Sequence, residues 1–124
     1  MPDWDVSRVT SMDSLFSSMR NPAITNLFNQ DLSRWNTAAV TNTAYMFLMA
    51  GSFNGDISRW DTGSVTTMAG MFDGAATFNQ DLSGWDVMAV TSNEEMWAGA
   101  AAMQDENKPC TPDGSSGDPD WRPC

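Results

Sequence analysis

Apolar positions recur along the chain with a fixed period of 25 residues, in segments that begin with Phe-Asn and end in tryptophan. The clearest segments are residues 28–35, 53–60 and 78–85, and each also has leucine or isoleucine three residues before its tryptophan. A constant period of this length is typical of architectures in which one structural unit stacks on the next. The pattern therefore predicts a solenoid.

A second apolar group follows each tryptophan. In the central repeat Val65, Met68, Met71 and Phe72 stand at i, i+3, i+6 and i+7, which is the spacing of one face of a short helix. The other regular repeats keep the spacing, with Thr43 and Asn93 in the second position, and small residues follow in each case. Glycine and alanine suit a helix C-terminus and close packing of coils. We expect a short helix or turn in this part of every coil.

The segment that ends in each tryptophan is the strand candidate. Residues 56–60 are bounded by turn-forming residues on both sides, and stacked copies would form a parallel sheet. The predicted fold is a small α/β solenoid of about four coils, with short parallel strands on one face and short helices or turns on the other. The expected coils are residues 3–27, 28–52, 53–77 and 78–102, and the expected aromatic core comprises Trp35, Trp60, Trp85, Phe47, Phe72 and Trp97.

The two ends of the chain depart from the repeat. Trp4 already stands in the middle of the motif, so we expect a mature or partial form of the protein. Residues 103–124 are rich in proline, glycine and aspartate and form a cap or tail, which the end of a solenoid core requires.

The repeats carry a family resemblance. The motif F-N-x-D-[LI]-S-x-W-[DN], followed by V-T-x-x-x-x-M-[FW], resembles the BspA-like leucine-rich repeat family, which includes repeats of unknown function in mycoplasma surface lipoproteins. The similarity covers residues 3–102, apart from an insertion in the first repeat, Thr43 and Asn93. It implies a leucine-rich-repeat-like solenoid at a cell surface, used in adhesion or protein binding. It supplies no catalytic residues.

Charge and motif content narrow the function further. The formal net charge is -10, so the chain lacks the basic footprint that nucleic acid or an anionic membrane surface requires. No apolar run is long enough to span a bilayer. The chain has no histidine and no nucleophile, phosphate-loop or zinc-protease motif, so we expect a protein that is not an enzyme and has no cofactor.

Two places stand out as candidate partner sites. Arg34 and Arg59 occupy matching positions on successive repeats, next to Ser33 and Ser58, whereas the third repeat has glycine. The pair either docks a carboxylate of a protein partner or forms ion pairs with Asp61 and neighbouring acids. The second place is the first-repeat insertion, with Arg20, Asn21 and Ile24, because solenoid insertions often lie on the binding face. A surface loop without function is its alternative.

The column of repeated aspartates and the column of repeated tryptophans each have two interpretations. Asp31, Asp56 and Asp81 suit calcium, but each also suits acceptance of backbone N–H groups within its own turn, which we favour. The matching column Asn29, Asn54 and Asn79 supports this, because such ladders bond the backbone of the next coil. The tryptophan column is either a carbohydrate platform or core, and packing at a constant position favours core.

Cys110 and Cys124 predict a disulfide in the tail, worth roughly 3 kcal/mol in the chain-entropy model. A disulfide places the protein in an oxidising location, either extracytoplasmic, at a cell surface or in an organelle lumen. Two free thiols in a cytosolic tail are the alternative. The function we expect is a non-catalytic protein-binding module for surface or extracytoplasmic recognition. The alternatives are an extrinsic structural subunit of a larger assembly, for example an algal organellar membrane complex, and more distantly a calcium- or glycan-binding module.

Overall fold

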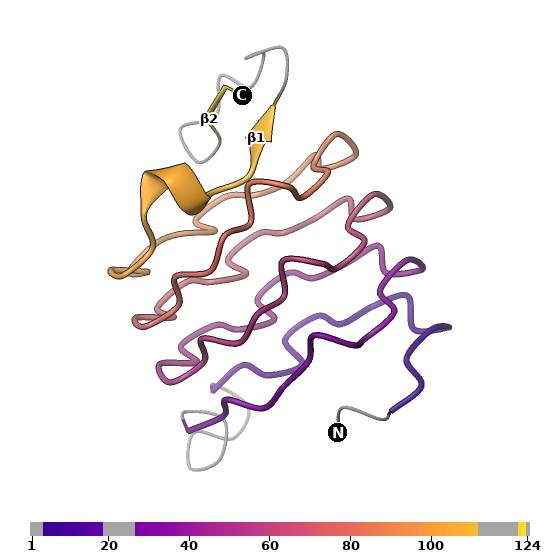
Figure 1. The fold of residues 1–124 in the computed structure, drawn as a ribbon, viewed down its shortest axis with the longest axis horizontal. Helices are drawn as coiled ribbons and strands as arrows, with labels where there is room; N and C mark the ends of the chain where they lie inside the picture. Colours follow the sequence, from indigo (N-terminus) through magenta and orange to yellow (C-terminus); the bar gives the residue numbers. More distant parts are fainter. Residues whose placement is uncertain (1–3, 19–26, 112–121, 124) are drawn as a thin grey trace.

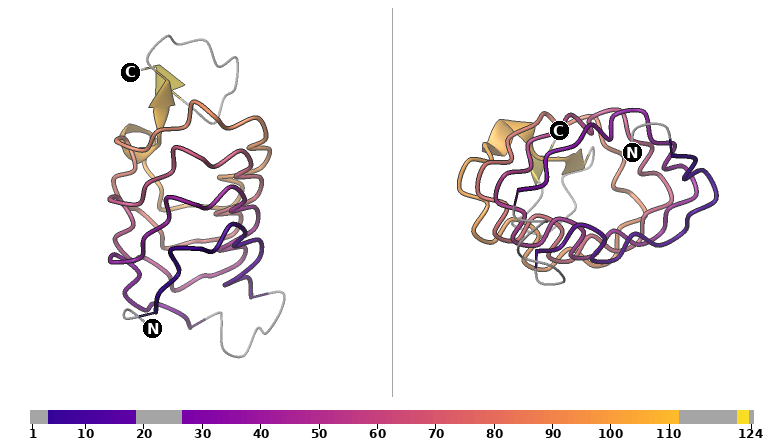
Figure 2. Two further views of the ribbon diagram at one scale, coloured as in Figure 1. Left: turned by 90° about the vertical axis from the view of Figure 1, so that its right-hand side faces the viewer. Right: turned by 90° about the horizontal axis from the view of Figure 1, so that it is seen from below.

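The chain winds into successive coils that lie one above the other (Figure 1). The structure is a computed structural model that describes residues 4–18, 27–111 and 122–123. Seen from below, successive coils superpose on one closed outline (Figure 2). The vertical contact between coils is made by the backbone, as the N–H of Thr41, Thr66 and Thr91 each donates to the preceding coil at 2.8–2.9 Å.

The predicted α/β class is wrong. In the described residues the helical element is the 3₁₀ helix η1 (Asp105–Asn107), and the strands are β1 (Cys110–Thr111) and β2 (Arg122–Pro123), which pair in parallel. All three elements follow the repeats. The coils themselves consist of turns and bends, with neither the strand expected at 56–60 nor the helix expected after each tryptophan.

The segment expected to be helical consists of consecutive turns instead. Met71, Asp73 and Ala75 each donate their N–H to the carbonyl three residues earlier, at 2.9–3.1 Å. Gly70 and Gly74 have φ of 59° and 73°. A left-handed residue interrupts a right-handed helix, and at the third position of a turn it is the mark of type II. Alternating turns thus place apolar side chains on the inner side with the same i, i+3, i+6, i+7 spacing that a helix would give.

We call these segments turn ribbons; they comprise residues 11–18, 42–49, 67–74 and 92–99. Each of the first three ribbons donates from every second N–H to a carbonyl of the next ribbon, at 2.7–3.1 Å. Isolated parallel bridges join them at Ser11, Asn42, Thr67 and Ser92. The ribbons therefore pair much as parallel strands do, although they consist of turns with isolated bridges and not of continuous strands. Backbone pairing between coils is thus made by the ribbons and not by the segment before each tryptophan, where the sheet was expected. In that segment Trp60 N–H closes a turn onto the Ile57 carbonyl.

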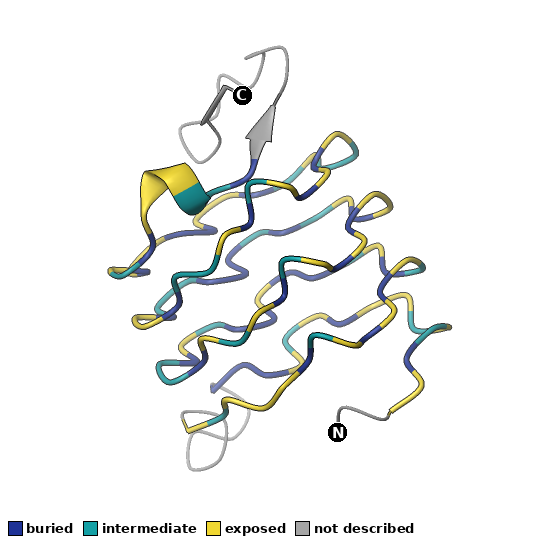
Figure 3. Cartoon of the chain, viewed as in Figure 1, coloured by how far each residue is buried: buried dark blue, intermediate teal, exposed yellow. Residues whose placement is uncertain are grey.

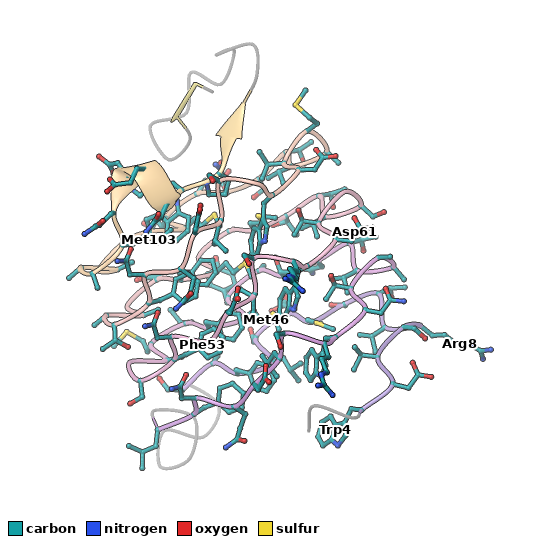
Figure 4. All side chains as sticks on the ribbon, viewed as in Figure 1. Trp4, Arg8, Met46, Phe53, Asp61 and Met103 are labelled. Carbon is teal, nitrogen blue, oxygen red and sulfur yellow. The ribbon has the colours of Figure 1, made fainter. Side chains whose placement is uncertain are left out.

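The core consists of side-chain columns that run through the stack. Figure 3 shows that buried residues alternate with exposed ones around every coil, and Phe53 and Met46 lie in the interior (Figure 4). The phenylalanine rings of 47 and 53 stack at 4.1 Å, and Trp60 stacks between Trp35 and Trp85 at 6.4 Å on either side. The whole predicted aromatic core is buried, namely Trp35, Trp60, Trp85, Phe47, Phe72 and Trp97. Trp4 differs, because it is 60% exposed and lies outside the buried tryptophan column.

On the other side of the stack, asparagine side chains link successive coils by hydrogen bonds. Asn54 N–H donates to Asn29 Oδ1 at 3.0 Å, and Asn79 N–H donates to Asn54 Oδ1 at 2.9 Å. The ladder continues past the last full repeat, where Gln104 N–H donates to Asn79 Oδ1 at 3.1 Å. Residues 103–107 thus begin a further level on the Phe-Asn side of the stack.

Candidate functional site

Arg34 and Arg59 share a surface pocket of about 220 Å³ with Ser33 and Asp56. Both arginines are exposed and lie on adjacent coils, one repeat apart. On the next coil Gly84 takes the equivalent position, and a side chain built there would meet nothing within 4 Å. The pocket is therefore lined by arginines of two adjacent coils together with Ser33 and Asp56, and the equivalent position on the third coil carries no side chain.

Each arginine is positioned by a turn before it and a buried tryptophan after it. Asp31 Oδ1 accepts the backbone N–H of Ser33 at 2.9 Å, and Asp56 Oδ1 accepts that of Ser58 at 3.0 Å. The following Trp60 is locked by its indole N–H, which donates to the Leu32 carbonyl of the preceding coil at 3.0 Å. The backbone of Arg59 is thus held on both sides while its side chain reaches solvent.

The Asp56 carboxylate in the pocket accepts hydrogen bonds from its own turn. The hydroxyl of Ser58 donates to Asp56 Oδ1 at 2.6 Å. This bond, followed by the Ser58 N–H, lowers the pKa of the Asp56 carboxyl, with a smaller contribution from the charge of Arg59. The pKa of Asp31 is lowered in the same way by Ser33. Both aspartates therefore stay ionised and serve as turn acceptors.

The arginines have no carboxylate partner within the described residues. The ion pair found there joins Lys108 to Asp105 at 2.9 Å, and none involves Arg34, Arg59 or Asp61. Asp61 instead accepts the N–H of Gly63 at 3.0 Å. In the described part of the chain, no ion pair thus joins either arginine to Asp61 or to a neighbouring acid. The charges of Arg34 and Arg59 still act on Asp31 and Asp56, whose pKa values they help to lower.

The aspartate and tryptophan columns have structural roles. Asp31, Asp56 and Asp81 each accept from the serine two residues later. The described residues contain no group of three or more His, Cys, Asp or Glu side chains that would hold a metal ion. The buried tryptophans offer no face to a sugar. The interior gap beside Trp60 and Met68 has no space for a water molecule.

Other predicted sites fall outside the described residues. The insertion residues Arg20, Asn21 and Ile24 lie in the segment 19–26, which is not described. Cys124 is likewise outside the described residues, and the structure describes only the backbone of Cys110. Partner binding by the insertion and the Cys110–Cys124 disulfide therefore stay predictions.

Sequence reasoning missed a second surface feature on the turn ribbons. Tyr45 and Met49 are 42% and 48% exposed and adopt left-handed φ of 56° and 58°. A Cβ at Gly70 would lie 2.4 Å from the Tyr45 ring, and one at Gly74 would lie 2.3 Å from Met49 Sδ. The two side chains thus lie over the glycines of the next coil. The sequence signal that could have revealed this feature is that glycines, Gly70 and Gly74, stand 25 residues after Tyr45 and Met49.

These features define a class: a repeat protein of stacked coils whose interior is filled by its own side-chain columns. The chain belongs to the family described as "Mycoplasma protein of unknown function, DUF285", whose model matches residues 1–109. No match was found among curated proteins or among solved structures.

In the described part of the chain, no helix has the length and apolar character needed to cross a membrane.

Proposed function

We propose that the protein is a non-catalytic binding module that recognises an acidic segment of a protein partner through the pocket between Arg34 and Arg59. The observation that carries this proposal is the pair of exposed guanidinium groups around one pocket of about 220 Å³, with no ion-pair partner among the described residues. A guanidinium is a planar fork that binds a carboxylate through two parallel hydrogen bonds.

The electrostatic setting supports a small, local contact. The chain has sixteen acidic and six basic residues, so its overall field repels an acidic partner at long range. Salt screens this repulsion beyond about a Debye length, 8–10 Å at physiological salt, so the charges that act on a bound carboxylate are those near the pocket. Asp56 borders the same pocket and stays ionised, so it disfavours an anion placed on its side. The bound carboxylate therefore lies between the guanidiniums, toward the open surface at Gly84.

The location we propose is a cell surface or another extracytoplasmic compartment. The family is a mycoplasma family, and the finer resemblance to BspA-like surface repeats and the predicted Cys110–Cys124 disulfide support an oxidising exterior. The alternative, an extrinsic structural subunit, is favoured by one observation. Trp4, Leu15 and Leu27 are 60%, 41% and 73% exposed, and such apolar groups mark interaction surfaces when they lie together.

A titration with hexaglutamate peptide tests the pocket. The Nε–H resonances of Arg34 and Arg59 should shift together, and the double variant Arg34→Ala, Arg59→Ala should lose at least about five-fold in affinity, as expected for exposed charge pairs. Arg8→Ala is the matched control, since Arg8 extends outward from the edge of the stack (Figure 4) and is exposed. Hexaglutamine should not bind.

Equal affinity in the double variant and in the control would refute the pocket as the binding site. Loss of affinity on deleting 20–25 with the arginines intact would move the site to the insertion.

A further inference from the structure

The pocket between Arg34 and Arg59 also holds a carboxylate that can accept from a cation. Asp56 lines this pocket, and its side chain is exposed. Its Oδ1 accepts the N–H and the hydroxyl of Ser58 at 3.0 and 2.6 Å. Among the described residues, no donor bonds Asp56 Oδ2 and no cation forms an ion pair with it. Each oxygen of an ionised carboxylate accepts about two hydrogen bonds, so Oδ2 has room for further donors.

This carboxylate lies in a locally negative part of the surface. Asp31 occupies the equivalent position on the preceding coil, and its charge acts against the lowering of the Asp56 pKa. Neighbouring carboxylates oppose each other's ionisation, and here the hydrogen bonds from Ser58 outweigh that repulsion. A cation beside Asp56 would relieve the repulsion between the two carboxylates, whereas an anion there would add to it.

The pocket thus has two sides of opposite charge. Arg34 and Arg59 provide planar forks for a carboxylate, whereas Asp56 suits an ammonium or a guanidinium. A ligand with one charge of each sign satisfies both sides. A ligand that is only acidic satisfies the arginines and meets Asp56 with like charge, which is how binding surfaces reject wrong partners.

The charge of the whole chain favours the same kind of ligand. The formal net charge of -10 repels a purely acidic segment as it approaches. A segment with equal numbers of acidic and basic residues has no net charge and escapes this repulsion.

We infer that the partner segment has mixed charge, with an acidic side chain on the arginine pair and a basic side chain beside Asp56. This inference rests on the proposed function, because it names the partner chemistry of the same pocket. In an extended segment the side chains of residues i and i+2 point to the same side, roughly 6.5 Å apart. An acidic and a basic residue at that spacing enter one pocket together, and Asp56 sets the specificity for the basic one.

The turn at Asp56 does not by itself require a charge. At another repeat position Asn36 Oδ1 accepts the N–H of Ala38 at 3.1 Å, and one coil later Asp61 Oδ1 accepts the N–H of Gly63 at 3.0 Å. Asparagine and aspartate thus close the same kind of turn in this chain. Asp56→Asn therefore removes the charge and keeps the turn acceptor.

Isothermal titration calorimetry with two octapeptides tests the inference. Both peptides have serine at every second position, and the remaining positions either alternate Glu and Lys or are all Glu. The wild type should bind the Glu-Lys peptide at least about three-fold more tightly than the all-Glu peptide, the scale of one exposed ion pair. In Asp56→Asn this preference should fall about three- to five-fold, and the affinity for the all-Glu peptide should rise.

Asp5→Asn is the matched control. Asp5 Oδ1 accepts the N–H and the hydroxyl of Ser7 at 3.0 and 2.6 Å, the same bonds that Asp56 accepts from Ser58. Asp5 is exposed and does not line the pocket, so Asp5→Asn removes the same charge elsewhere and should leave the peptide preference unchanged. An equal fall in both variants would mean that net charge alone sets the preference, and the inference would be wrong.

Carbon NMR of the wild-type protein locates the basic group independently of any variant. The carboxyl carbon of Asp56 should shift when the Glu-Lys peptide is added, whereas that of Asp5 should not. If Arg34→Ala, Arg59→Ala weakened binding of both peptides while Asp56→Asn left the preference unchanged, this inference would fail and the proposed function would stand. No binding of either peptide to the wild type would overturn both.

Discussion

Truncation of Trp60 probes whether the aromatic columns hold the stack together. The side chain is 5% exposed, its ring lies between Trp35 and Trp85, and its indole N–H donates to Leu32 O at 3.0 Å. A buried aromatic of this size removes roughly 200 Å² from water. At about 25 cal/mol per Å² this amounts to about 5 kcal/mol, an upper bound because the unfolded chain is partly collapsed.

We therefore expect Trp60→Ala to lower the free energy of unfolding by about 3–5 kcal/mol, the usual range for large core aromatics. That is a large share of the roughly 5–15 kcal/mol available to a domain. Trp60→Phe keeps a ring and loses the indole hydrogen bond, so it should cost less, with about 1–2 kcal/mol from the bond alone. Urea denaturation followed by circular dichroism measures these differences, provided that the m-value is unchanged.

Trp4→Ala is the matched control, because Trp4 has the same place in the repeat but is 60% exposed. Its effect should stay within about 0.5 kcal/mol. If Trp60→Ala and Trp4→Ala shifted the urea midpoint equally, burial in the column would not be the source of stability and the core assignment would fail.

Three further predictions concern backbone strain, pH and the tail. Gly70→Ala should lower the free energy of unfolding by more than the roughly 1–2 kcal/mol of a left-handed alanine, because its Cβ would also meet the Tyr45 ring. In the same urea assay, adding Tyr45→Ala should recover the part of the loss due to the steric contact but not the part due to the left-handed φ. The lowered pKa of Asp56 means that its contribution to stability is present above the ordinary value of 3.8 and is lost as pH falls through the lower folded value. Unfolding titrations at pH 7, 5 and 3 should show this loss, and the stability of Asp56→Asn should be less sensitive to pH. Equal pH profiles for the two proteins would contradict the prediction. Intact mass after alkylation without reductant should show Cys110 and Cys124 unmodified, and labelling of both would remove the disulfide and the argument for an oxidising compartment.

Much of the architecture follows from the sequence alone. The 25-residue period predicts stacking, and the column positions of phenylalanine, leucine or isoleucine, and tryptophan predict which side chains are buried. Asn54 and Asp56 also behave as their residue types suggest, because short polar side chains next to a turn bond the nearest backbone N–H. Such local chemistry needs no knowledge of distant parts of the chain.

The conformation of the ribbons was decided by tertiary structure. An apolar spacing of i, i+3, i+6 and i+7 is satisfied by a helix and also by alternating turns, and the difference lies in the sign of φ at a few residues. Tyr45, Met49 and Glu95 adopt left-handed φ although none is glycine. The same holds for the arginine pocket, where the distance to each acid, and not the composition, determines whether the charges pair. In the ribbons, backbone groups bond to the neighbouring coil, and these hydrogen bonds offset a conformation that the residues disfavour locally.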